Sequence, residues 1–203
     1  MMMAPWLRHC ALGDRWLDLA RPNSYLQPMT TLSIIEAPDP RLKIKSTPVE
    51  AVDGGIRTLV ADMLETMYKA PGIGLAAIQV GVPKRLLVID LQEKDEETGT
   101  TIRDPMVFIN PVLSEPSEDY AVYNEGCLSV PEQYADVERP ASIRAQWLDE
   151  QGKAHDKRLE GMLATVIQHE MDHLEGILFI DHLSRLKRDM LLKKLIKMRK
   201  LAA

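Results

Sequence analysis

The clearest periodic pattern of apolar residues lies between positions 55 and 69. Apolar side chains recur there at intervals of three and four, which places them on one face of a helix; they are Ile56, Leu59, Val60, Met63, Leu64 and Met67. The segment APGIG then ends this helix. The same reasoning predicts a second helix over about 162–174 and a third over about 184–200.

Several shorter segments have the composition of β-strands. RLLVID (85–90) and MVFIN (106–110) are rich in aliphatic residues and are separated by the polar loop QEKDEETGT. Residues 142–161 have the pattern of a hairpin that turns at DEQGK. Because strands and helices do not alternate regularly, the pattern predicts an α+β fold.

Composition narrows the class of protein. The 203 residues are 45% hydrophobic and 27% charged, which suits one soluble globular domain. Cys10 and Cys127 are too few for a disulfide framework, which favours a reducing cytoplasm. No apolar run reaches the roughly 18 to 20 residues of a membrane span. The net charge of -5 gives no reason to expect general binding to DNA or RNA.

The first 28 residues differ from the rest of the chain. They contain two of the three tryptophans and show no clear period, so we expect residues 1–28 to be a poorly ordered leader ahead of a single domain, 29–203. Three arginines are compatible with an organellar transit peptide, whereas Asp14 and Asp18 argue against one. An alternative is that Met29 is the true start.

The segment QHEMDHLEG contains an H-E-x-x-H pattern on the predicted second helix. His169 and His173 are four residues apart, so both imidazoles can reach one ion while Glu170 stands beside it. This pattern indicates a metal site with a general base. A catalytic centre usually has three protein ligands, so a third one is needed.

Three residues compete for the place of the third ligand. The longer motif H-E-x-x-H-x-x-G-x-x-H is not available, because its last position is Phe179. For His182, the interpretation as a surface or capping residue is favoured over a ligand role, and Glu175 points to another helix face. Cys127, in EGCLSVPEQ, is by itself as often a small buried residue. Beside an incomplete H-E-x-x-H it becomes the best candidate, because thiolate is an excellent ligand for zinc or iron(II).

A third stretch, GIGLAAIQVG (72–81), combines glycines with an amide side chain. The amide of Gln79 could donate a hydrogen bond to a developing oxyanion. Alone, however, the glycines more often mark a bend where backbones pack closely.

With these three stretches in order, the chain resembles the peptide deformylases. The family is marked by G-φ-G-φ-A-A-x-Q, E-G-C-φ-S and Q-H-E-x-D-H-φ, which stand here as GIGLAAIQ, EGCLS and QHEMDHL. The similarity extends over about 32–199. PEQYADVERP and FIDHLSRLKRDMLLKKL further resemble bacterial members. The resemblance implies antiparallel sheets packed around a central helix that carries HEMDH, followed by a C-terminal basic helix.

The resemblance also implies an activity, which is hydrolytic removal of the N-formyl group from nascent formylmethionyl polypeptides with release of formate. Cys127, His169 and His173 would hold the metal, iron(II) natively, with zinc, nickel or cobalt as substitutes. Glu170 would be the general base that takes a proton from the metal-activated water. Gln79 and the backbone N–H of Leu128 would form the oxyanion hole.

Substrate contacts follow partly from the helix and partly from the resemblance. Met162 and Thr165 share the helix face of His169, and Val166 that of His173, so these three could line a methionine pocket or simply be core. By resemblance, Ile73 and Gly74 would bound the pocket, and Glu125 would support the site. Many members carry arginine directly after PEQ, whereas this chain has Tyr134, which puts contacts to the downstream peptide in doubt.

The segment 185–200 carries eight basic residues and one acidic residue. Its apolar stripe is expected to dock on the body of the protein; the stripe consists of Leu186, Met190, Leu191, Leu195 and Met198. The basic face is either an ordinary solvated face or, as the resemblance implies, a contact to the ribosome near the exit tunnel. The rival hypotheses for the whole chain are a zinc endopeptidase and a ribosome-associated binding protein without catalysis.

Overall fold

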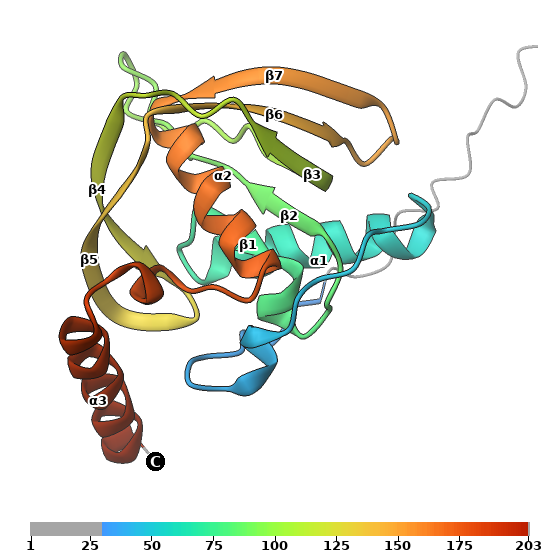
Figure 1. Cartoon of the computed structure of the whole chain (residues 1–203). Coiled ribbons are helices and arrows are strands. Elements are labelled where there is room, and N and C mark those ends of the chain that lie inside the picture. The colour runs from blue at the N-terminus through green and yellow to red at the C-terminus, as the bar shows by residue number, and fades with distance from the viewer. Residues whose placement is uncertain (1–29, 203) are drawn as a thin grey trace, which may run out of the picture.

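The computed structural model describes residues 30–202, so the predicted leader lies outside the described residues (Figure 1). The helices are α1 (Gly54–Lys69), α2 (Gly161–Leu174) and α3 (Arg185–Ala202). Each lies within two residues of its predicted boundaries. Short 3-10 helices add η1 (Pro40–Lys43), η2 (Ala77–Val80) and η3 (Phe179–His182).

The described chain forms two antiparallel sheets, so the predicted α+β class is confirmed. The larger sheet has the order β1-β2-β3-β6-β7 and the smaller one pairs β4 with β5. The strands are β1 (Gly74–Ala76), β2 (Leu86–Ile89), β3 (Met106–Ser114), β4 (Tyr120–Cys127), β5 (Val130–Pro140), β6 (Ser142–Leu148) and β7 (Ala154–Glu160). The predicted hairpin is β6–β7, whereas the sequence pattern missed β1, β4 and β5.

The larger sheet is covered by a helix on each face, which explains why all four residues of β2 are buried. Leu87 and Ile89 belong to the apolar cluster that includes Ala164 and Ile167 of α2. Their neighbours Leu86 and Val88 point the other way, into the cluster built around α1. The helix α2 is thus enclosed between the two sheets, as predicted (Figure 1).

The helix α3 projects from the body beside β5 (Figure 1). Its Leu195 is buried against Val137 and Phe179, with Leu191 and Leu192 packed around them. The docking stripe is shorter than predicted, because Leu186 and Met190 are 73% and 61% exposed. They lie in the first half of α3, on the side of the helix that faces solvent. None of the described helices has the length and apolar character to cross a membrane.

Candidate metal centre and substrate pocket

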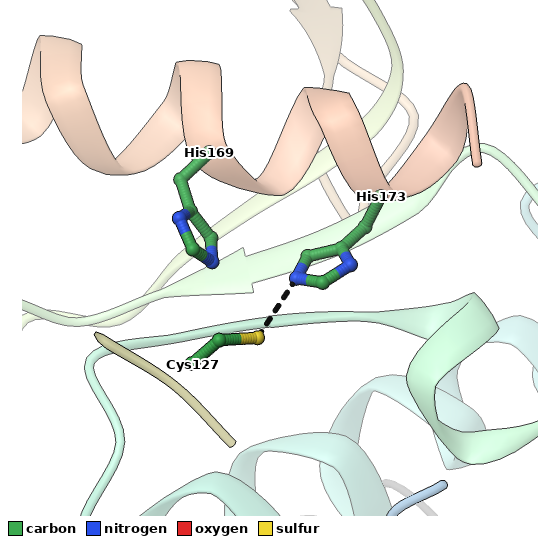
Figure 2. A group of neighbouring side chains, drawn as sticks. All are labelled: Cys127, His169 and His173. Carbon is green, nitrogen blue, oxygen red and sulfur yellow. Dashed lines mark hydrogen bonds between the residues drawn. The ribbon is translucent and has the colours of Figure 1, made fainter. Parts of the chain in front are cut away.

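Three side chains converge on one point between the two sheets. The ligand atoms of Cys127, His169 and His173 all lie within 4.8 Å of one another, and Cys127 Sγ is 3.2 Å from His173 Nε2. Figure 2 shows the two imidazoles descending from α2 towards the thiol. The predicted trio is therefore brought together, although its members are up to 46 residues apart.

Local structure explains how each ligand reaches this point. The histidines lie one turn apart on a helix that is buried on most sides, so their rings, 5.1 Å apart, face the same way. Cys127 ends β4, where the pairing with β5 shifts register between Gly126 and Cys127. This irregularity turns the end of β4 towards α2.

The donor set fits a divalent transition metal. His169 Nδ1 donates to Glu125 Oε2 at 2.7 Å, which leaves its Nε2 available to an ion. Two imidazole nitrogens and one thiolate are the ligands that zinc and iron(II) accept, with a fourth position left open. In the absence of an ion, burial lowers the pKa of His169, but its hydrogen bonds to Cys127 and Glu125 overcome this and raise the pKa well above 6.5.

The carboxylate that orients His169 is itself held by a buried chain of charges. Arg139 donates to both oxygens of Glu125, at 2.6 and 3.0 Å, and to Asp172 Oδ2 at 2.8 Å. Asp172 also accepts from His182 at 2.7 Å. Burial raises the pKa of Glu125, but the hydrogen bonds from His169 and Arg139 more than offset this, so Glu125 is ionised at neutral pH. His182 therefore contacts Asp172 and lies outside the three-residue cluster.

Glu170 lies beside the cluster with an unusual environment for a carboxylate. It is 4% exposed, and its Oε2 has no hydrogen-bond partner among the described residues. Burial raises its pKa from 4.5 to about 7. A carboxyl group with this pKa can both accept and return a proton near neutral pH.

Gln79 is fixed with its amide nitrogen towards the cluster. Its Oε1 accepts from the backbone N–H of Ala76 at 2.8 Å. Its Nε2 is 3.1 Å from Ser129 Oγ and 3.6 Å from Cys127 Sγ. Ser129 was not singled out in the sequence, although it completes EGCLS. Its buried hydroxyl helps to hold the amide in place.

These groups open into one cavity of about 550 Å³, a size typical of small-ligand sites. Of the residues predicted for the site, all but His173 line it; they are Ile73, Gly74, Gln79, Glu125, Cys127, Leu128, Met162, Thr165, Val166, His169 and Glu170. Thr165 is buried within it and Met162 is exposed at the mouth. Sequence reasoning missed Arg139, because nothing local marks an arginine that pairs with two distant acids.

Tyr134, the departure noted in the sequence, also lines this cavity. It is 64% exposed, and its ring lies directly against Gly126 on the paired strand. A Cβ at Gly126 would be only 2.5 Å from Tyr134 Cε1. The ring therefore fills the space above that glycine at the edge of the cavity.

An α+β fold with an H-E-x-x-H helix, a cysteine beside it and a buried glutamate in a pocket defines the class of metal-dependent hydrolases. Comparison with known proteins narrows the class. The polypeptide deformylase family model matches residues 31–189. A peptide deformylase of Rhizorhabdus wittichii is 74% identical over 167 residues, which cover 82% of this chain and 94% of that protein.

Comparison with solved structures points to the same family. The crystal structure of peptide deformylase from Ehrlichia chaffeensis has a TM-score of 0.79 and 41% identity, covering 85% of this chain and 99% of the other. A Met-Ala-Ser-bound class I type b peptide deformylase from Acinetobacter baumannii has a TM-score of 0.70 and 30% identity, covering 76% and 99%. The chain belongs to the polypeptide deformylase family. It is thus an enzyme of the class that removes the N-formyl group from nascent peptides.

Proposed function

We propose that this chain hydrolyses the formyl group of N-formylmethionyl nascent peptides and releases formate, with Glu170 as the general base. The observation that carries the proposal is the buried carboxyl of Glu170, whose Oε2 has no hydrogen-bond partner among the described residues and which lines the same cavity as Cys127, His169 and Gln79. A formamide is a poor electrophile and water a poor nucleophile, so both must be activated.

Cys127, His169 and His173 would hold one divalent ion, expected to be iron(II), with zinc, nickel or cobalt able to substitute. Such an ion supplies Lewis acidity that polarises the formyl carbonyl and makes water more acidic. Glu125 would orient His169 through their hydrogen bond. This role explains why a charged pair with Arg139 lies in the interior, where a lone carboxylate would be unstable.

Proton transfer and charge stabilisation are assigned to three groups of this chain. Glu170 would take a proton from the attacking water and deliver it to the leaving amine. Negative charge would then develop on the formyl oxygen, where Gln79 Nε2 and the backbone N–H of Leu128 would donate hydrogen bonds. One such preorganised donor is worth about 3 kcal/mol in the transition state.

The peptide would bind along β1, which is the edge strand of the larger sheet. Asp90 N–H bonds to Ile73 C=O, so in an antiparallel ladder the N–H and C=O of Gly74 point away from β2, towards the cavity that Gly74 lines. An extended peptide can pair with such an edge. Ile73, Met162, Thr165 and Val166 would surround the methionine side chain. The Met-Ala-Ser bound to the Acinetobacter enzyme supports a ligand of this kind.

The basic helix α3 would contact the ribosome near the exit tunnel, and we place the enzyme in the cytoplasm. On α3, the exposed Leu186 and Met190 and the surrounding lysines and arginines form a free surface for contact with the ribosome. Binding that depends on phosphates must weaken as salt rises. Affinity for purified ribosomes that is equal at 50 and 300 mM salt would contradict this assignment.

The activity is tested by measuring formate release from formyl-Met-Ala and cleavage of unformylated Met-Ala-Ser. We expect formate from the first and no cleavage of the second, whereas a zinc endopeptidase would cleave peptide bonds without need of a formyl group. Glu170→Gln should retain the metal and lower turnover by about 10²- to 10⁴-fold. Unchanged turnover in this variant would show that Glu170 is not the base, and no formate from the metal-loaded protein would favour a binding protein without catalysis.

A further inference from the structure

Five consecutive residues, 70–74, form one wall of the cavity; we call them the pocket rim. The inner side of the rim has almost no free space. A Cβ at Gly72 would lie 2.7 Å from Leu128 Cδ1, and one at Gly74 would lie 2.4 Å from Glu170 Oε1. The rim therefore has no room to move inward, so a loosened rim would move away from Leu128 and Glu170 and weaken its contact with a bound peptide.

The far side of the rim is tied to the chain that follows β2. The side chain of Gln92 reaches back, and its Nε2 donates to Gly72 C=O at 2.8 Å. One residue further along the rim, Ile73 C=O accepts from Asp90 N–H at 2.9 Å. Gln92 does not line the cavity, so its contact with the site runs through the rim backbone.

Gln92 makes this contact from an uncommon backbone conformation. Its φ is +52°, in the left-handed region that few residues other than glycine and asparagine adopt readily. Asp90 holds it there, because Asp90 Oδ1 accepts from Gln92 N–H at 2.9 Å while Oδ2 accepts from Tyr68 O–H at 2.6 Å. Asp90 is 2% exposed, so a buried carboxyl group and a residue in an uncommon backbone conformation both support the hydrogen bond from Gln92 to the rim.

We propose that Gln92 is a positioning residue that sets the pocket rim at the depth required for peptide binding. The proposal rests on the proposed function, in which the substrate pairs with the rim at Gly74. The rim continues into β1, an edge strand of only three residues, so the sheet restrains it from one side alone. Before β1, the rim is held to the end of α1 by Ala70 N–H to Thr66 C=O and Gly72 N–H to Met67 C=O, both at 3.0 Å. The hydrogen bond from Gln92 to Gly72 C=O is the side-chain restraint on this part of the rim.

The test compares three variants in the metal-loaded enzyme. Gln92→Glu preserves the length of the side chain but removes the N–H donor. Gln92→Asn tolerates the left-handed φ but is one methylene too short. Gln151→Glu, at an exposed turn between β6 and β7, is the matched control. The two Gln92 variants should raise KM for formyl-Met-Ala-Ser about two- to tenfold, the effect of one hydrogen bond, with kcat changed less than twofold.

Hydrogen exchange supplies a readout that does not depend on activity. Amides of residues 70–76 should exchange faster in Gln92→Glu than in the wild type, while those of α1 and β6 and all those of Gln151→Glu remain unchanged. An unchanged KM would overturn the inference. A rise in KM accompanied by a lower melting temperature and faster amide exchange throughout the described molecule would overturn it as well, because it would show a general loss of stability. If the wild type releases no formate, the proposed function fails, and the exchange of the rim alone decides whether Gln92 holds it.

Discussion

Replacing Gly74 by alanine tests whether the position of Glu170 controls the rate. The added Cβ would stand 2.4 Å from Glu170 Oε1, 2.9 Å from its Cδ and 3.0 Å from Val166 Cγ1, whereas ordinary contact begins at 3.4 Å. The carboxylate must therefore move by about 1 Å. A displacement of this size at a reacting group lowers the rate by about 10²-fold, which corresponds to about 2.7 kcal/mol in the activation barrier. Overpacking should lower the free energy of unfolding by about 1–3 kcal/mol.

The assay is kcat for formate release from formyl-Met-Ala, with metal content and urea denaturation measured on the same sample. Gly54→Ala is the matched control, because nothing lies within 4 Å of a Cβ at that position, and it should leave kcat and metal content unchanged. If Gly74→Ala is folded, holds its metal and retains kcat within twofold, the exact placement of Glu170 does not limit the reaction.

Three further predictions concern the buried charges. Arg139→Leu leaves two acids without their cation, so urea denaturation should show a loss of about 3–5 kcal/mol, and a loss below 1 kcal/mol would contradict the role of the pair. Glu125→Gln should weaken metal binding about 10- to 100-fold in a chelator competition; equal affinity would mean that His169 needs no such partner. In metal-free protein the pKa of Glu170 is raised to about 7 from 4.5, so its stabilising contribution is present below pH 4.5 and lost as pH rises through 7. From pH 5 to 8 the melting temperature of the wild type should therefore fall relative to that of Glu170→Gln.

The helix that carries the two histidines of the proposed metal site could be predicted from sequence, because its pattern is local. His169, Glu170 and His173 need only the helical repeat to be brought together. Cys127 could be inferred as a candidate third ligand, because two histidines leave a metal site incomplete. Its distance from the histidines could not be predicted from the sequence. β4 and β5 were missed because prolines, glycines and charged residues on their exposed faces hide the alternation of strands. Arg139 has no local signal at all, since its acids lie 14 and 33 residues away.

The proposed metal centre also lies at a junction in the fold. Cys127 belongs to the two-stranded sheet, whereas both histidines belong to a helix that packs on the five-stranded sheet. Beside the cluster, this junction is spanned by polar contacts, Glu125 to His169 and Arg139 to Asp172. Buried ion pairs stabilise a fold weakly because their desolvation offsets their attraction. An ion bound to both sides stabilises the folded state by its own binding free energy. We therefore propose that the charges between β4, β5 and α2 aim the proposed ligands, and that an ion bound by these ligands would hold the two parts together.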